Sequence, residues 1–278
     1  MARILVTSAG KANGGGHDAV LGFDAAGKLV GPFSEDPRIV DPRGLCVDPS
    51  GALIYLNSGA DRMLALDLGG RVVRDSGPIA DLDPGGAVFG PDGSYYVTMR
   101  RRRTIAAISA ALDDHPRPFL PEGIVPFPRG FAFGPDGTLY LASGIGPSGQ
   151  GDNRVLVFHR DAMARPVPLV TDPELSPLDL TLAPNGNLVV ASESPFGASD
   201  AEVTVREYDP ASGKLVRVLT PDRSLNFRRP RGLRLGSEGH LYCVGESHVV
   251  SWDFSTGRCL GIAAHLDRLN GQALVLLG

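Results

Sequence analysis

Three arginines occupy the same place in three copies of one short motif. Arg43, Arg129 and Arg231 each lie between a proline and a glycine, just ahead of a short apolar run. A guanidinium group carries a permanent positive charge and a planar fork of N–H donors, which fits a carboxylate or a phosphate. The recurrence of this group at one motif position predicts a site that binds an anion.

Three further residues are candidates for moving protons. His17 and His248 fall in predicted loops, and an imidazole can act as a general acid or base near neutral pH. Glu246 lies two residues before His248, where it can orient that imidazole or act itself. The alternative interpretation is that these are exposed loop histidines and an ordinary solvated carboxylate.

Several common catalytic motifs are missing from the sequence. It has no Ser-His-Asp order, no nucleophile elbow and no zinc-ligand spacing. The Gly-rich stretches at 11–18 and 143–153 lack the Lys-Ser/Thr ending of a phosphate-binding loop. The sequence therefore gives no indication of a serine-hydrolase triad, a zinc site or a phosphate-binding loop. We expect no cofactor.

The arginine triplets belong to a repeat that fills the chain. Five strong copies begin at prolines that are 42, 44, 49 and 53 residues apart, namely Pro42, Pro84, Pro128, Pro177 and Pro230. Each copy has a short apolar run, a turn such as Pro-Asp-Gly, and a second run rich in Tyr and Val. Two more polar, strand-like runs follow, so the unit is a four-stranded antiparallel sheet.

The two ends of the chain complete a sixth unit. Residues 3–10 resemble a second strand and residues 19–33 a third and fourth, while residues 269–278 supply the missing first strand. We therefore expect an all-β, six-bladed β-propeller, a single domain over residues 1–278, closed by its C-terminal strand. An open-ended solenoid is the alternative.

The phrase from Pro128 to Gly144, "PRGFAFGPDGTLYLASG", resembles NHL-repeat propellers and the gluconolactonase/regucalcin-like superfamily of six-bladed propellers. The resemblance implies that the residue between proline and glycine points into a central channel. Those positions, taken in chain order, are Arg43, Gly85, Arg129, Leu178, Arg231 and Asn270. It also implies a divalent cation held there by carboxylates or amides, as in metal-dependent lactonases.

This sequence departs from the lactonase pattern. Asn270 and Asp179, which stands where the other copies have glycine, cannot supply the six or so oxygen ligands that Ca²⁺ prefers. Arginines on alternate blades would instead converge on the axis and repel a cation. The alternative is that each arginine bonds carbonyls of its own blade or pairs with an acid such as Asp41 or Asp179.

Long connections are expected around the same end of the axis. The loops between second and third strands open on the face where the inner strands begin, and several are long or charged. They span residues 8–18, 100–103, 143–153, 192–202 and 245–248.

Composition narrows the possible partners. The chain of 278 residues has a net charge of −4, which disfavours a nucleic-acid or membrane-surface binder, and no apolar run is long enough to span a bilayer. Its three cysteines cannot all pair with one another, and the start of the chain lacks a signal-peptide apolar region. We therefore expect a cytoplasmic protein.

Together, these features predict a propeller that binds a small anionic organic molecule at its axis. Arg43, Arg129, Arg231, Asn270 and Asp179 are the candidate ligand-binding residues, and His248, His17 and Glu246 the candidate catalytic ones. The favoured activity is that of a metal-independent hydrolase, lyase or cyclase. The alternatives are an NHL-like module that docks a protein partner and a metal-dependent lactonase.

Overall fold

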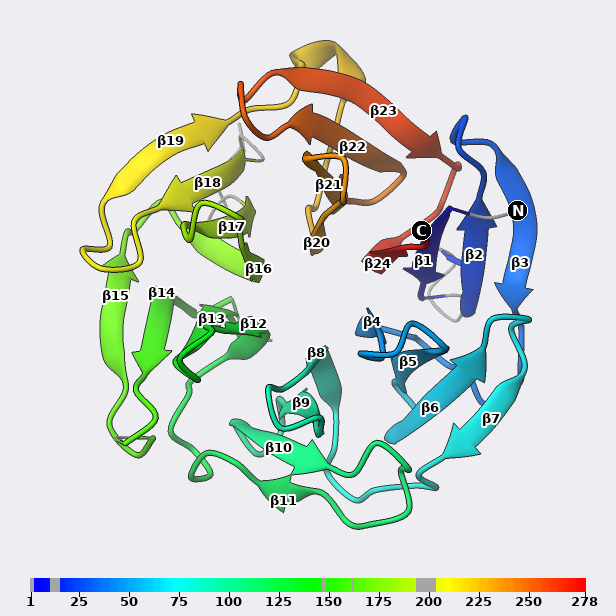
Figure 1. Ribbon diagram of the computed structural model, residues 1–278, viewed down its shortest axis with the longest axis horizontal. Coiled ribbons are helices and arrows are strands. Elements are labelled where there is room, and N and C mark those ends of the chain that lie inside the picture. The colour runs from blue at the N-terminus through cyan, green and yellow to red at the C-terminus, as the bar shows by residue number, and fades with distance from the viewer. Residues whose placement is uncertain (1–2, 11–15, 147–148, 162, 194–203) are drawn as a thin grey trace.

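Six four-stranded antiparallel sheets stand in a ring around a central axis in the computed structural model (Figure 1). The structure describes residues 3–10, 16–146, 149–161, 163–193 and 204–278. Among these residues, regular helix is limited to a 3₁₀ turn at Arg223–Leu225. The predicted six-bladed β-propeller is confirmed.

Each blade runs from an inner strand at the axis to an outer strand at the rim. Blade 1 contains β24 (Gly271–Leu276), β1 (Ile4–Ser8), β2 (Ala19–Phe23) and β3 (Leu29–Ser34). Blade 2 contains β4 (Leu45–Val47), β5 (Leu53–Ser58), β6 (Arg62–Asp67) and β7 (Val72–Asp75). Blade 3 contains β8 (Pro84–Phe89), β9 (Tyr95–Met99), β10 (Thr104–Ile108) and β11 (Arg117–Pro118).

The other three blades follow the same order. Blade 4 contains β12 (Pro128–Phe133), β13 (Leu139–Ile145), β14 (Gly151–Phe158) and β15 (Val167–Thr171). Blade 5 contains β16 (Ser176–Leu182), β17 (Leu188–Glu193), β18 (Thr204–Tyr208) and β19 (Leu215–Leu219). Blade 6 contains β20 (Gly232–Leu235), β21 (His240–Val244), β22 (His248–Asp253) and β23 (Cys259–His265).

The two ends of the chain close the ring in blade 1. Strand β24 pairs antiparallel with β1, from Ile4 opposite Leu276 to Ser8 opposite Gly271. No loop joins these two strands directly, so hydrogen bonds and packing alone hold the first blade together. This is the closure that the end segments of the sequence predict.

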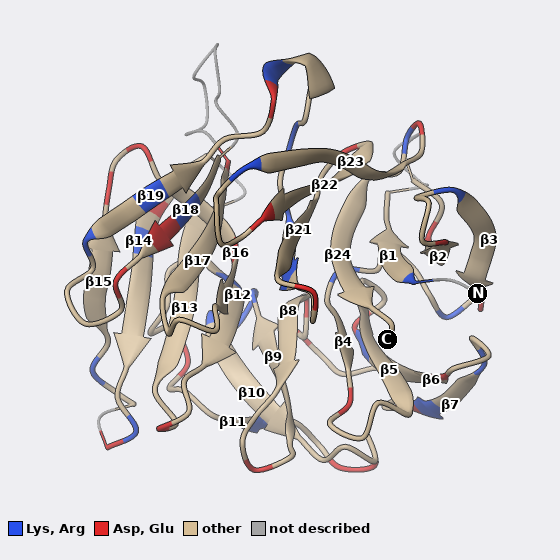
Figure 2. Ribbon diagram, turned by 45° about the horizontal axis from the view of Figure 1, so that its top comes forward, with Lys and Arg blue, Asp and Glu red and all other residues tan. Residues whose placement is uncertain are grey.

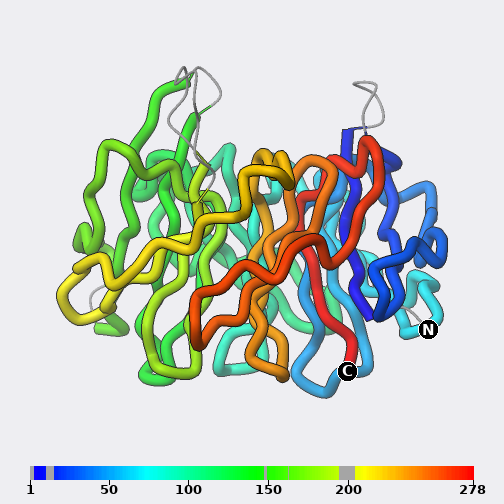
Figure 3. The backbone as a smooth tube through the Cα atoms, turned by 90° about the horizontal axis from the view of Figure 1, so that it is seen from above, coloured from blue at the N-terminus to red at the C-terminus, as the bar shows by residue number. Residues whose placement is uncertain are grey.

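The core lies between neighbouring blades, because each sheet packs its faces against the next one. Between blades 5 and 6, for example, Trp252 is fully buried in a cluster with Val189 and Val205. Seen from the side, the strands run between the two faces of a disc (Figure 3). The described part of the chain contains no helix that could span a bilayer.

The glycine of the Pro-x-Gly triplet is required by close packing at the axis. A Cβ atom on Gly86 would lie 2.8 Å from the Cα of Gly130, and one on Gly130 would lie 2.0 Å from Oδ1 of Asp179. At these two positions the neighbouring inner strand therefore lies too close for a side chain. The triplet thus brings the residue that precedes each glycine to the axis.

Candidate functional site

A pocket of about 750 Å³ lies on the axis, at the end where the inner strands begin. Cavities of this size accommodate small organic ligands. Six of the eight residues predicted to form a site line it, namely Arg43, Arg129, Asp179, Arg231, Glu246 and Asn270. Their proposed roles remain predictions, but the structure brings them to one place.

The three motif arginines come from alternate blades around this pocket. Arg43 precedes the inner strand of blade 2, Arg129 lies in that of blade 4, and Arg231 precedes that of blade 6. Burial, followed by the positive charges of Arg43 and Arg231, lowers the pKa of Arg129 below its ordinary value. The three guanidinium groups are therefore near enough to repel one another.

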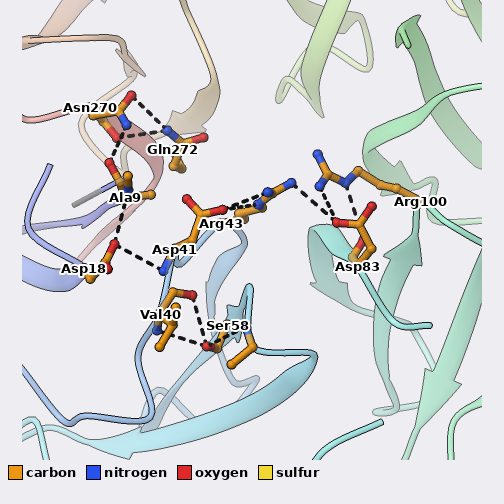
Figure 4. Close-up of polar contacts among 12 residues, drawn as sticks. Ala9, Asp18, Val40, Asp41, Arg43, Ser58, Asp83, Arg100, Asn270 and Gln272 are labelled. Carbon is orange, nitrogen blue, oxygen red and sulfur yellow. Dashed lines mark hydrogen bonds and ion pairs between the residues drawn. The ribbon is translucent and has the colours of Figure 1, made fainter. Parts of the chain in front are cut away.

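Arg43 is neutralised by acidic neighbours. Its guanidinium lies 2.8 Å from Oδ2 of Asp41 and 3.8 Å from Oδ1 of Asp83, and Asp83 also accepts a hydrogen bond from Arg100 (Figure 4). This is the pairing with Asp41 that the sequence left open. Arg43 thus brings little uncompensated charge to the pocket.

Arg129 and Arg231 have a different environment. Arg129 donates to the carbonyl of Ile145 in its own blade, and its Nε–H is buried without a partner. Arg231 donates to Oε1 of Gln272 at 2.6 Å, and burial lowers its pKa. Among the described residues neither arginine forms an ion pair, so both keep a positive charge that faces the pocket.

Asp179 and Arg234 form an ion pair in the lining of the pocket. Asp179 takes the place of the triplet glycine in blade 5, and its oxygens accept hydrogen bonds from the backbone N–H of Leu180 and Leu233 at 3.0 and 2.9 Å. Arg234 donates to Asp179 at 3.1 Å and to the carbonyl of Leu45 in blade 2 at 3.0 Å. Burial raises the pKa of Asp179, and the charge of Arg234 opposes that shift.

The predicted ligand residue Asp179 therefore has its hydrogen-bonding capacity occupied by the protein. We expect Asp179→Asn to lower the free energy of unfolding by about 1–3 kcal/mol, because the amide nitrogen would face a donor and leave it unpaired. Chemical denaturation of the variant measures this. Glu35→Gln, on the surface, is the control. An unchanged denaturation midpoint in the Asp179 variant would show that the hydrogen bonds of Asp179 do not stabilise the fold.

Asn270, Glu246 and Glu193 also line the pocket. Asn270 donates to the carbonyl of Ala9, so its amide ties the blade 1 entrance together (Figure 4). Glu246 lies 3.6 Å from the guanidinium of Arg229. Glu193, at the end of β17, faces the same space, and its charge raises the pKa of both Arg129 and Arg231 against the lowering caused by burial.

The two histidines expected to act in catalysis lie elsewhere. His248 does not line the pocket; its ring stacks on that of His265 with 4.6 Å between centroids, on the two outer strands of blade 6. His17 is exposed and also lies outside the pocket lining. Of the three proton-transfer candidates, the structure brings only Glu246 to the pocket.

The stacked pair gives His248 a testable pH dependence. Burial and the neighbouring His265 lower the pKa of His248 below 6.5, so the unfolded chain takes up the proton first as the pH falls. Stability should therefore decrease as the pH drops below about 6.5. His248→Asn should flatten this part of a pH series of thermal melts, whereas His115→Asn, at an exposed site, should not. Equal curves for both variants would contradict this role.

Charged residues directly before the triplet form a second ring around the axis, which the sequence analysis did not predict. Four non-glycine residues directly before the triplet, or before its counterpart in blade 1, have positive φ, an uncommon conformation that costs energy. They are Asp41 (42°), Asp83 (34°), Arg229 (52°) and Arg268 (58°). Three of them line the pocket, and Asp83 is bonded to residues that do. The recurrence of charge just ahead of the triplet was a signal available in the sequence.

Parts of the predicted mouth loops fall outside the described residues. These parts are 11–15, 147–148 and 194–203, within the loops at 8–18, 143–153 and 192–202. The loop at 245–248 contributes Glu246, and the run of arginines at 100–103 contributes Arg100. The loop at 192–202 contributes Glu193, so the described portions supply three charged groups to the pocket.

The divalent cation implied by the family resemblance does not fit the donors present. The carboxylates of Asp41 and Asp179 are held by Arg43 and Arg234, so their oxygens are already neutralised. Within the described ranges, no group of three His, Cys, Asp or Glu side chains is arranged to hold a metal ion. A hard cation needs several oxygen ligands, and here it would meet guanidinium groups instead.

Comparison with known proteins adds evidence on the fold. No family model and no curated protein sequence matches this chain. A solved structure of a nidogen/laminin complex contains a chain that is 14% identical, with a TM-score of 0.76 over 100% of this chain and 99% of that one. A candidate gluconolactonase is 17% identical, with a TM-score of 0.63 over 90% and 88%.

An inactive variant of virginiamycin B lyase from Staphylococcus aureus, solved with quinupristin, is 16% identical, with a TM-score of 0.58 over 84% of this chain and 73% of that one. The likeness is one of fold. At such low identity the shared propeller carries no residue roles from those proteins to this one. The chemistry must therefore be argued from the pocket itself.

Proposed function

We propose that the axial pocket binds a small organic anion, with Arg129 and Arg231 as its principal ligands. The observation that supports this most strongly is that these two half-buried arginines face the cavity without an ion-pair partner among the described residues. A carboxylate or phosphate would supply the missing counter-charge and acceptors for the unpaired Nε–H of Arg129.

The charge of the pocket is distinct from that of the whole chain. Seven arginines and four carboxylates line it, whereas the net charge of the protein is −4. Elsewhere acidic and basic segments are interspersed over loops and outer strands (Figure 2). A positive cavity in an acidic protein favours a small anion that can enter it over an extended polyanion.

The pocket also has apolar walls. Phe131, Ile145 and Leu178 line it beside the arginines. A concave cavity of about 750 Å³ that combines apolar side chains with a few convergent charges is typical of a small-molecule site. This favours a small ligand over the protein partner that remains the alternative.

Hydrolase, lyase or cyclase activity is the favoured use of this site. A guanidinium group stabilises the oxyanion or enolate that forms when a bond next to a carboxylate is broken. Glu193 and Glu246 are the carboxylates placed to accept a proton there. The proposal is consistent with the similar fold of the gluconolactonase candidate and of virginiamycin B lyase. A cytoplasmic location and independence from metal stay predictions.

A thermal-shift screen with paired ligands tests the proposal. Small organic acids should raise the melting temperature of the protein, and their uncharged amides should not, because the guanidinium groups recognise charge. Acids that bind can then be followed by NMR for turnover by the wild type, Glu193→Gln and Glu246→Gln. If no acid shifts the transition, or if the amides act equally, the anion-binding proposal is wrong.

A further inference from the structure

The charges around the pocket balance only in part. Three of its arginines have a carboxylate partner within hydrogen-bonding distance: Arg43 lies 2.8 Å from Asp41, Arg234 lies 3.1 Å from Asp179, and Arg100 donates to Asp83. These pairs contribute no net charge to the cavity.

The remaining arginines outnumber the remaining acids. They are Arg129, Arg229, Arg231 and Arg268, and the acids are Glu193 and Glu246. Glu246 lies 3.6 Å from Arg229, and Arg268 forms no ion pair with a described residue. The described lining therefore keeps an excess of two positive charges, even when Asp83 is counted among the acids.

This excess is divided between two levels. Arg129 and Arg231 lie at the triplet level and are half-buried. Arg229 and Arg268 lie at the rim: the side chain of Arg229 is 55% exposed, and Arg268 is an exposed residue. Both rim arginines hold the positive φ that recurs at the same position before the inner strand of their blades. Two separate levels of guanidinium groups therefore face one cavity.

We propose that the ligand is a small dianion with its two acidic groups at opposite ends, of the dicarboxylate or phosphocarboxylate class. This rests on the proposed function and extends it. One anionic group binds between Arg129 and Arg231, and the other binds at the rim on Arg268, with Arg229 beside it. A monoanion fills the deep level alone and leaves the rim charge uncompensated, so the pocket selects the dianion.

Isothermal titration with matched ligands tests this inference. The probes are linear dicarboxylates from succinate to suberate and the monomethyl ester of each, which keeps the length and removes one charge. For the best-fitting chain length, the diacid should bind the wild type roughly tenfold more tightly than its ester, because one charge-assisted contact separates them.

Single substitutions test which arginines bind each acidic group of the ligand. Arg129→Gln should lower the affinity for the diacid and for the ester alike, by roughly tenfold or more. Arg268→Gln should lower the affinity for the diacid several-fold and leave the affinity for the ester unchanged. Arg71→Gln, whose side chain is 84% exposed and pairs with Asp67, is the control and should bind both ligands as the wild type does.

The outcomes separate the two proposals. Equal affinity for diacid and ester, or an equal effect of Arg268→Gln on both, would leave anion binding standing and overturn the two-level dianion. Binding of neither ligand class to the wild type would overturn the proposed function and this inference with it.

Discussion

Deleting residues 270–278 is expected to abolish the cooperative fold. The deletion removes β24, whose Ala273, Leu274 and Val275 are buried, and it leaves β1 without its inner partner. Each large aliphatic side chain contributes about 1.5–3 kcal/mol through burial. With the lost ladder and the opened core of neighbouring blades, the total approaches the whole stability of a typical domain, about 5–15 kcal/mol. Circular dichroism melts and gel filtration measure the result.

A circular permutant provides the matched control. Joining the end of β24 to the start of β1 with a short glycine turn, and opening the chain before residue 270, makes blade 1 continuous like the other five. Because the strands and their contacts are unchanged, this permutant should fold and melt cooperatively. A deletion variant that melts as the wild type does would show that the ring does not depend on its closing strand.

The double variant Arg129→Gln/Arg231→Gln is expected to lose anion affinity by roughly a hundredfold or more. Each charge-assisted hydrogen bond contributes roughly 1.5–3 kcal/mol, so losing both deep contacts removes most of the binding energy of a small acid. Titration of the acid that gives the largest thermal shift measures this loss.

The same variant should be at least as stable as the wild type. Burial and mutual repulsion disfavour the charged forms of both arginines, so neutral side chains relieve an unfavourable interaction in the folded state. A large fall in melting temperature with affinity retained would instead show that these arginines hold the blades together. Stability and affinity should therefore change in opposite directions, which a purely architectural role does not predict.

The fold was predictable because the conserved positions of the repeat have clear structural requirements within this one chain. In the turn at 135–138, Gly137 adopts a φ of 84° and Asp136 accepts the backbone N–H of Thr138 at 3.0 Å. The glycine of the triplet is needed where inner strands nearly touch. These requirements recur from blade to blade, so the sequence repeats the triplet glycine in five of the six blades, with Asp179 as the exception.

The composition of the site was less predictable, because partners come from distant parts of the chain. Arg43 is neutralised partly by Asp83, which is 40 positions away and one blade along the ring. The triplet alone therefore could not show that Arg43 differs from Arg129 and Arg231. That difference depends on which acids the adjacent blade presents.

Arg234 could have been recognised as a site residue by aligning the repeats with one another. It occupies the place of Val88 in blade 3, Ala132 in blade 4 and Ala273 in blade 1. A single arginine among small or apolar residues on the channel wall needs a buried acid, and Asp179, the single acid among the triplet glycines, is that partner. The two departures from the repeat pattern explain each other.

The direction of the His248 side chain could not be predicted from its position in the sequence. Its loop reaches the mouth, but the pleat of β22 directs the ring toward His265 on the neighbouring outer strand. Glu246, two residues earlier, lines the pocket. Sequence position placed both residues near the axis, and only the strand register decides which side chain faces it.

Anomalous diffraction from crystals soaked in selenate determines whether Arg129 and Arg231 bind an anion in the axial pocket. Selenate is a compact dianion, and the anomalous signal of its selenium locates it whatever the natural ligand is. We expect strong anomalous density within hydrogen-bonding distance of both Arg129 and Arg231, and its loss in the double glutamine variant. Density confined to surface arginines such as Arg71, with none in the axial pocket of the wild type, would contradict it.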